Sequence, residues 1–258
     1  AYRVHPYRHP VIGYEDLLRT MSREDLLAYY HQRYVPQNMT VVIVGDIDIA
    51  RTEKMVRETF STWPRKRWAP MFVPAEPPQT APRHARETRP VQLTRIRWAY
   101  PSVALTDPDA AVLDVLSFVL GRGRSARVFK DLVEEKQVAV NAEAWSYTPA
   151  DPGLFAFSLT CQPDQEAKLL EALQSQINSW KSLPFTQEEL DRAKRQLLIQ
   201  ELNNLLTVDG QATYYGMNYF YTGSPTFGEQ YLEQVESVTL ADLNRVIDTW
   251  LLPERRIL

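Results

Sequence analysis

A helix-capping pattern occurs twice in this chain, 217 residues apart, and it points to a fold built from repeated units. The first copy is Ser22–Leu26 and the second is Thr239–Leu243, and both read hydroxyl, two residues, Asp, Leu. The offset is constant, since 239 − 22, 242 − 25 and 243 − 26 all equal 217, and the same offset places Pro36 on Pro253. A capping box, a helix length and a helix breaker that recur in step predict an internal repeat.

The repeat divides the chain into three parts. Residues 1–63 are predicted to be the last part of one lobe, and residues 91–258 most of a second. Residues 64–90 are proline-rich without an apolar period and are predicted to be a linker. The counterpart of the strand that begins at Val91 would lie roughly 126 positions before Ala1, so the chain is expected to begin inside the first lobe.

The order of elements predicts an α+β fold, with an antiparallel sheet covered by helices. Met39–Val44 is rich in β-branched residues and predicts a buried strand. Further strands are predicted near 91–100, 138–147 and 154–161, and helices near 22–34, 48–63, 107–121, 125–135, 165–180 and 186–206, with two more after them.

Composition excludes several classes of protein. The 258-residue chain is 44% hydrophobic with a net charge of −3, which favours neither disorder nor a dominant nucleic-acid surface. Its single cysteine, Cys161, excludes an intrachain disulfide and a cysteine-based metal knuckle. No apolar run approaches the roughly 20 residues that span a bilayer, and the first residues do not form a signal peptide.

Three segments carry a family resemblance. His5–Gly13 and Tyr34–Asp46 resemble the late first-lobe pattern of pitrilysin-type (M16) zinc peptidases, a family that includes the mitochondrial processing peptidases. Gly121–Phe129 resembles the glycine-rich turn and following helix of the second lobe, with Gly121, Gly123, Ser125 and Arg127 as its motif residues. The resemblance implies M16-type α+β lobes, two to each half, and two halves that close over a peptide. It also implies that zinc is held by an HxxEH motif and a distant Glu, all in the first lobe.

That zinc motif is absent from this sequence. The four histidines are His5, His9, His31 and His84. His5 and His9 have helical spacing, but prolines follow both and no Glu lies between them, so we interpret them as packed loop residues. The second-lobe helix over 107–120 has no metal ligand, and we predict no catalytic residue, metal site or cofactor in this chain. Zinc is expected in the parent protein, with its motif about 100 residues before Ala1.

The resemblance also indicates which half of an M16 enzyme this is. Val133 and Val140 stand where many members carry an Arg and a Tyr that steady the substrate carbonyl. Valine cannot donate a hydrogen bond to an oxyanion, so this lobe is not the Arg/Tyr-bearing one. In two-part bacterial members the half without that pair is often the half that binds zinc.

We therefore predict the non-catalytic portion of a zinc metallo-endopeptidase, with a peptide substrate and a second M16 half as partners. A free strand edge is predicted to pair with peptide through Val138, Ala139, Val140, Asn141 and Ala142. The alternative is a non-catalytic M16-like scaffold or presenting subunit. The compartment is open between bacterial periplasm and cytoplasm.

Three other sequence patterns have a structural interpretation. Gly121-x-Gly123-x-x-Ala126 follows a helix rather than a strand, which argues against a dinucleotide site. Trp63–Trp68 interleaves basic and aromatic residues but is interpreted as a solvated segment, and no nucleic-acid partner is predicted. The aromatic residues over 214–221 could line a peptide chamber, but their spacing favours a core or interface role.

Overall fold

The computed structural model describes residues 1–66, 71–180 and 184–258. The chain divides into two compact units. One unit comprises Ala1, Pro78–Asn203 and Phe227–Leu258, and the other Tyr2–Pro77 and Asn204–Thr226. The lobe boundaries at 63 and 90 remain a prediction.

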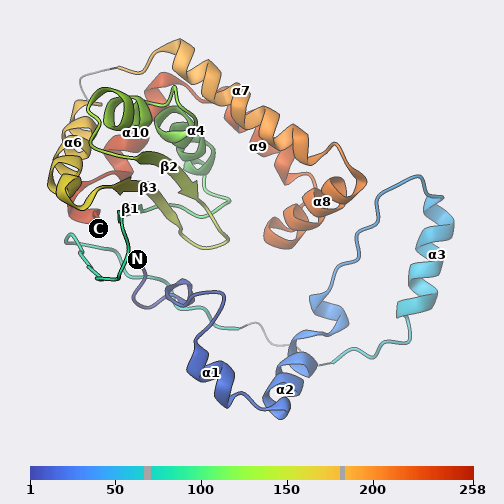
Figure 1. The fold of residues 1–258 in the computed structure, drawn as a ribbon. Helices are drawn as coiled ribbons and strands as arrows, with labels where there is room; N and C mark the ends of the chain where they lie inside the picture. Colours follow the sequence, from blue (N-terminus) through green and yellow to red (C-terminus); the bar gives the residue numbers. More distant parts are fainter. Residues whose placement is uncertain (67–70, 181–183) are drawn as a thin grey trace. The chain divides into compact units, whose positions relative to one another are not determined.

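The first unit combines a small sheet with a layer of helices, as an α+β fold requires (Figure 1). Its strands are β1 (Thr94–Pro101), β2 (Asn141–Tyr147) and β3 (Leu154–Cys161). Its helices are α4 (Asp109–Gly121), α5 (Arg127–Phe129) continued by a π-helix (Lys130–Glu135), α6 (Glu166–Ser179), α7 (Gln187–Asn204), α9 (Phe227–Ser237) and α10 (Leu240–Trp250). α7 ends one residue inside the second unit.

The three strands are antiparallel in the order β1-β3-β2, so β2 lies at an edge. The register pairs Ala144 with Phe157 and Ser146 with Phe155, which places these four residues on one face. On that face Ala144, Phe155 and Phe157 are buried and Ser146 is half-buried, whereas Glu143, on the opposite face of β2, is exposed. One side of the sheet therefore packs on the core and the other carries polar side chains.

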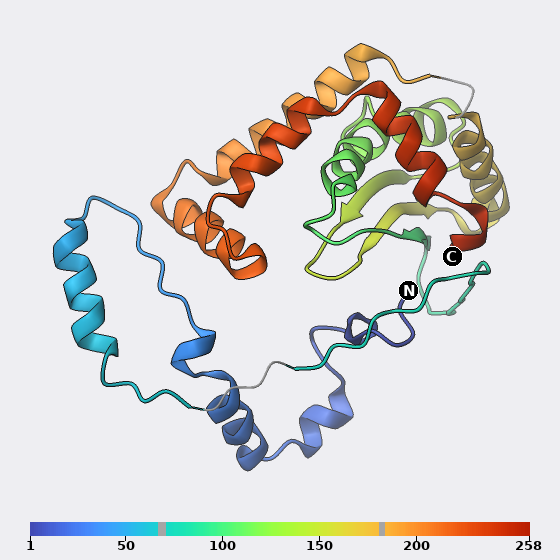
Figure 2. The same ribbon diagram turned by 180° about the vertical axis from the view of Figure 1, so that it is seen from behind.

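The helical layer covers the apolar face of the sheet, as Figures 1 and 2 show from opposite sides for α4, α6 and α10. α4 is the central helix, and Leu113, Leu116 and Leu120 are fully buried. Because α4 is apolar on nearly all sides, it is a core helix rather than an amphipathic surface helix. No helix in the described ranges is long and apolar enough to cross a membrane.

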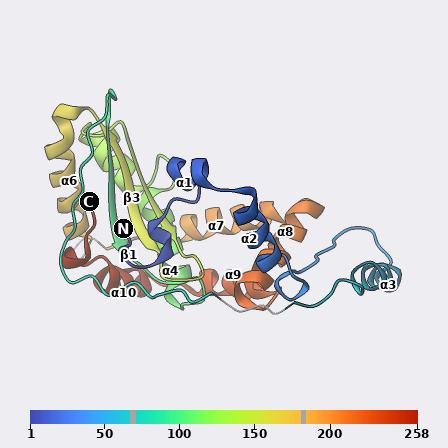
Figure 3. The same ribbon diagram turned by 90° about the horizontal axis from the view of Figure 1, so that it is seen from below.

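The second unit consists of short helices joined by extended segments, shown for its N-terminal part in Figure 3. Its α-helices are α1 (Glu15–Thr20), α2 (Arg23–Arg33), α3 (Ile49–Phe60) and α8 (Val208–Thr222). None of the four buries a residue fully.

The predicted strand over Met39–Val44 is wrong for this structure. The segment is irregular, and Val41 and Ile43 are 51% and 46% exposed. A strand forms only by pairing with another strand, and 39–44 has no such partner within the described residues.

Three of the aromatic residues of α8 are not core residues either, whereas Tyr214 and Tyr215 are half-buried. Phe220 is 69% exposed, and Tyr219 and Tyr221 are 46% and 43% exposed. A core role is therefore wrong for these three residues, and an interface role stays a prediction.

The two copies of the predicted repeat match in helix length, in the capping box and in the turn that follows the helix. α2 and α10 both have eleven residues, and both begin with a complete capping box. A 3-10 turn follows each, at Pro36–Asn38 and Pro253–Arg255, so the offset of 253 − 36 = 217 holds for the turns as well. After the second turn, Ile257 pairs with Ala99 of β1. The two segments thus share local geometry as well as sequence pattern.

The cap of α10 leads to a first prediction. Thr239 Oγ1 accepts the backbone N–H of Asp242 at 3.3 Å, and Asp242 Oδ2 accepts that of Thr239 at 2.9 Å. Thr239→Ala removes the side-chain acceptor and is expected to cost about 1 kcal/mol, or roughly 2–4 °C in Tm by thermal denaturation. Ser22→Ala removes the same cap from α2, which buries no residue, and is expected to change the main transition less. Equal shifts for the two variants would contradict this expectation.

Candidate functional site

The glycine-rich turn after α4 contains one glycine fixed by packing and one fixed by backbone conformation. A Cβ on Gly121 would lie 1.8 Å from the backbone N of Ala144 and 2.5 Å from its Cα. Gly123 has φ +82°, but a Cβ there would meet no atom within 4 Å. Gly121 therefore lets the end of α4 approach the backbone of β2, and Gly123 makes the turn. Ser125, the third motif residue, is exposed on the turn.

Arg127, the last of the motif residues, is a structural anchor. Its guanidinium donates to both carboxylate oxygens of Glu189, with Nε–Oε1 and Nη2–Oε2 distances of 2.7 Å. It also donates to the carbonyl of Pro184 at 2.9 Å and lies 4.3 Å from the ring centroid of Phe185. These contacts fix α5 to the start of α7.

The five residues predicted to bind peptide fall partly on the edge strand. Asn141 and Ala142 belong to β2, whereas residues 138–140 form the approach to it. The N–H groups of Val138 and Ala139 donate to the carbonyl of Leu132, and that of Val140 to Thr160 of β3. Because those three amides are already used, only the β2 part of the predicted segment offers an edge.

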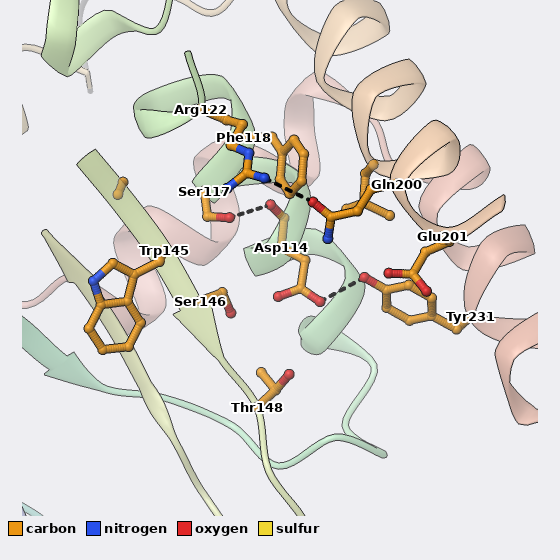
Figure 4. Close-up of a pocket in the computed structure, with 12 residues that line it drawn as sticks. Asp114, Ser117, Phe118, Arg122, Trp145, Ser146, Thr148, Gln200, Glu201 and Tyr231 are labelled. Atoms are coloured by element: carbon orange, nitrogen blue, oxygen red, sulfur yellow. Dashed lines mark hydrogen bonds between the residues drawn. The ribbon is translucent and has the colours of Figure 1, made fainter. Parts of the chain in front are cut away.

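A cavity of about 290 Å³ lies beside β2 in the helical layer (Figure 4). Its residues come from α4, β2 and the turn after it, α7 and α9. They are Asp114, Ser117, Phe118, Arg122, Ala144, Trp145, Ser146, Thr148, Leu197, Gln200, Glu201 and Tyr231. All belong to the first unit.

The carboxyl of Asp114 is the central polar group of this cavity. Tyr231 Oη donates to its Oδ2 at 2.7 Å. Burial raises the pKa of Asp114 to about 6, although Tyr231 and Ser146 act to lower it, and the nearby charge of Glu201 raises it further. Burial and the charge of Asp114 also raise the pKa of Tyr231 well above its ordinary value.

Two other groups complete the polar wall. The Ser146 hydroxyl is buried and makes no hydrogen bond of normal geometry, although it lies close enough to Asp114 to affect its pKa. Arg122, the only basic residue among the described lining residues, donates to Gln200 Oε1 at 3.1 Å. Among the described lining residues, the cavity therefore holds two carboxyls, Asp114 and Glu201, and one basic side chain, Arg122.

The histidines do not form a metal centre. His5 is 3% exposed, and its Nδ1 accepts the N–H of Tyr7 at 3.1 Å. His9 is exposed, and its Nε2 accepts from Arg8 at 3.0 Å. Within the described ranges no three His, Cys, Asp or Glu side chains are grouped to hold a metal ion. The residues present do not fit a zinc site.

The cavity was not predicted from the sequence, although one signal for it was present. Asp114 is a single carboxyl in the apolar run of α4, and a lone charge on a buried helix marks a group that needs a partner. Its neighbours Glu201 and Tyr231 lie on other helices, so no spacing could have connected them.

Comparison with known proteins places this fold in a family. A family profile described as "peptidase M16 inactive domain" matches residues 20–197. The chain belongs to the peptidase M16 inactive-domain family. The zinc protease PqqE of Helicobacter pylori is 28% identical over 212 residues, which cover 80% of this chain and 47% of that protein. An uncharacterised zinc protease of Streptomyces coelicolor is 24% identical over 248 residues, covering 92% of this chain and 53% of its own length.

Solved structures support the M16 fold. A crystal structure of a protease from Helicobacter pylori has a TM-score of 0.89 at 24% identity and covers 99% of this chain and 63% of that one. The M16 inactive domain from Pseudomonas fluorescens has a TM-score of 0.84 at 20% identity, covering 99% and 61%. The chain spans about half the length of the curated relatives it matches. The M16 resemblance and the α+β fold predicted from the sequence are confirmed.

Proposed function

We propose that this M16 inactive domain is the non-catalytic part of a zinc-dependent endopeptidase, where it forms part of the chamber wall and holds peptide at the edge of β2. The family match and the zinc protease relatives support a peptidase parent. Zinc and the second M16 half are assigned to that parent, because the residues described here do not fit a metal site.

The observation that carries the peptide-holding role is the position of β2. β3 is its only strand neighbour in the described sheet, so one side of β2 has no strand partner. The other edge strand, β1, pairs with Ile257 outside the sheet. An extended peptide could add to β2 by main-chain hydrogen bonds, a mode that tolerates many sequences.

Peptides methylated on alternate backbone nitrogens test this role. In an added strand, alternate N–H groups point toward β2. Methylation of the nitrogens that point toward β2 is expected to weaken binding about ten-fold, whereas methylation of the nitrogens that point away should change it little. Binding is measured by calorimetry on the 258-residue chain, and amide exchange of β2 reports the site. Equal affinities for the two methylated peptides would rule out strand addition.

The parent protein tests the wider assignment. Zinc content and peptidase activity of the full-length parent are compared with those of this chain. One zinc per parent molecule and chelator-sensitive cleavage by the parent alone are the expected results. A parent without zinc would favour the second candidate, a non-catalytic M16-like scaffold.

A further inference from the structure

We propose that the cavity between β2, α4, α7 and α9 binds a basic side chain, the guanidinium of arginine or the ammonium of lysine, from a peptide held at β2. The inference rests on the proposed function for the peptide, but the cavity's chemistry stands on its own residues. Asp114 and Glu201 provide the two carboxyls on its wall.

The charges on the cavity wall favour a cation. The described lining residues include two carboxyls and one basic residue, Arg122. Arg122 donates a hydrogen bond to Gln200, and its guanidinium carbon lies 5.6 Å from the ring centroid of Phe118. Tyr231 supplies a hydrogen bond to Asp114 but no positive charge. Asp114 forms no ion pair within the described residues, so a bound ammonium or guanidinium would neutralise its buried carboxylate.

The polar atoms of the wall also suit such a group. The buried Ser146 hydroxyl has no hydrogen-bond partner of normal geometry and can accept one N–H. Figure 4 shows Asp114, Ser146 and Glu201 around a shared space, with the Phe118 ring nearby. A flexible alkyl stem can pack on apolar surface while its charged end reaches the carboxyls.

The position of the cavity connects it to β2. Ser146 lies on the helix-facing side of β2, in register with the buried Phe155. Side chains of a strand alternate between faces, so alternate residues of a peptide added to β2 would also face the helical layer. A residue beside Ser146 would have its side chain directed to the cavity.

A pair of probes tests the cavity without involving peptide pairing. L-argininamide and L-citrullinamide, which has an uncharged ureido group in place of the guanidinium, are titrated into the 258-residue chain, and NMR shifts of the Ser146 and Thr148 amides are followed. Argininamide is expected to bind at least about ten-fold more tightly, because the two probes share the same α-ammonium and only argininamide has a charged side chain. Equal binding, or no shift at these groups, would overturn the inference, as would displacement of argininamide by Ca²⁺ or Mn²⁺ at the same residues.

Three variants make the test specific. Glu201→Gln is expected to weaken argininamide binding roughly five-fold or more, and Asp114→Asn likewise, with Tyr231 able to donate to the new amide oxygen. Glu134→Gln is the matched control, because it removes a carboxylate paired with Arg124 outside the cavity, and it should leave binding unchanged. An equal loss in the control would contradict a role for the cavity.

The pH dependence of argininamide binding distinguishes a direct contact with Asp114 from a purely structural role of that residue. The groups facing Asp114 are Tyr231 from α9, Glu201 from α7, Ser146 from β2 and Arg122 at the end of α4. Its pKa is raised to about 6, so binding should strengthen as pH rises through 6. Glu201→Gln should keep this rise and Asp114→Asn should lose it.

The two proposals fail separately. If argininamide does not bind but the two methylated peptides still differ in affinity, only the cavity inference is lost. If argininamide binds and the methylated peptides do not differ, strand addition is lost and the cationic cavity remains.

Discussion

Gly121→Ala is expected to be the most damaging single substitution in the sheet-containing unit. The new Cβ would lie 1.8 Å from Ala144 N, 2.5 Å from its Cα and 2.6 Å from its Cβ. Two of these atoms are backbone, so no rotamer change can relieve the clash, and α4 and β2 must separate. The expected cost exceeds about 4 kcal/mol, a large part of the total stability of a domain. Soluble yield and Tm are the measurements.

Gly123→Ala separates this steric effect from the general effect of replacing a turn glycine. A Cβ at Gly123 meets nothing within 4 Å, and only its φ of +82° opposes substitution. Its cost should be about 1–2 kcal/mol, the penalty for a left-handed conformation at one non-glycine residue. If both variants lose the same stability, close packing of α4 on β2 is not what requires Gly121.

The displacement would extend to the candidate site. Ala144, Trp145 and Ser146 line the cavity from β2, and Asp114 and Ser117 line it from α4. A separation of these two elements therefore changes the wall on both sides. Any Gly121→Ala protein that stays folded is expected to bind argininamide more weakly than Gly123→Ala.

Local signals in the sequence predicted much of the fold. The capping boxes at Ser22 and Thr239 are set by a hydroxyl and a carboxylate three residues apart, and both are present in the structure. The helix predicted near 186–206 also begins with such a box, in which Glu189 Oε2 accepts the Thr186 N–H at 2.8 Å. Such features depend on a few neighbouring residues, so the sequence alone specifies them.

Features that depend on distant partners were not predictable in this way. Met39–Val44 has strand composition but lacks a described strand to pair with. The cavity needs Asp114, Glu201 and Tyr231 from three helices, and only the fold brings them together. Part of the predicted Trp63–Trp68 cluster, residues 67 and 68, lies outside the described residues.

Glu189→Gln is expected to destabilise the protein at neutral pH and to remove one component of its acid sensitivity. Glu189 pairs with Arg127 through two hydrogen bonds of 2.7 Å, and the two side chains are 17% and 18% exposed. Burial would raise the pKa of Glu189, but hydrogen bonds from Arg127 and Thr186 and the charge of Arg127 outweigh it and lower the pKa to about 2 from 4.5.

The direction of the pH effect follows from that lowered pKa. The folded state holds the carboxylate ionised more strongly than the unfolded state does, so this stability is fully present above about pH 4.5 and is lost as pH falls toward 2. After allowing for solvent screening, its loss in Glu189→Gln should cost about 1–3 kcal/mol at pH 7. The cost should shrink between pH 4.5 and 2, as measured by urea unfolding across that range.

Glu134→Gln distinguishes the buried pair from a surface pair of the same type. Arg124 and Glu134 form an ion pair at 3.1 Å, but their side chains are 83% and 40% exposed. Such pairs contribute little because water screens the charges and the side chains lose conformational freedom when they pair. Glu134→Gln should therefore follow the unchanged protein at every pH, whereas the Glu189→Gln difference narrows in acid. Parallel curves for Glu189→Gln and the unchanged protein would mean that the Arg127 pair does not link stability to pH.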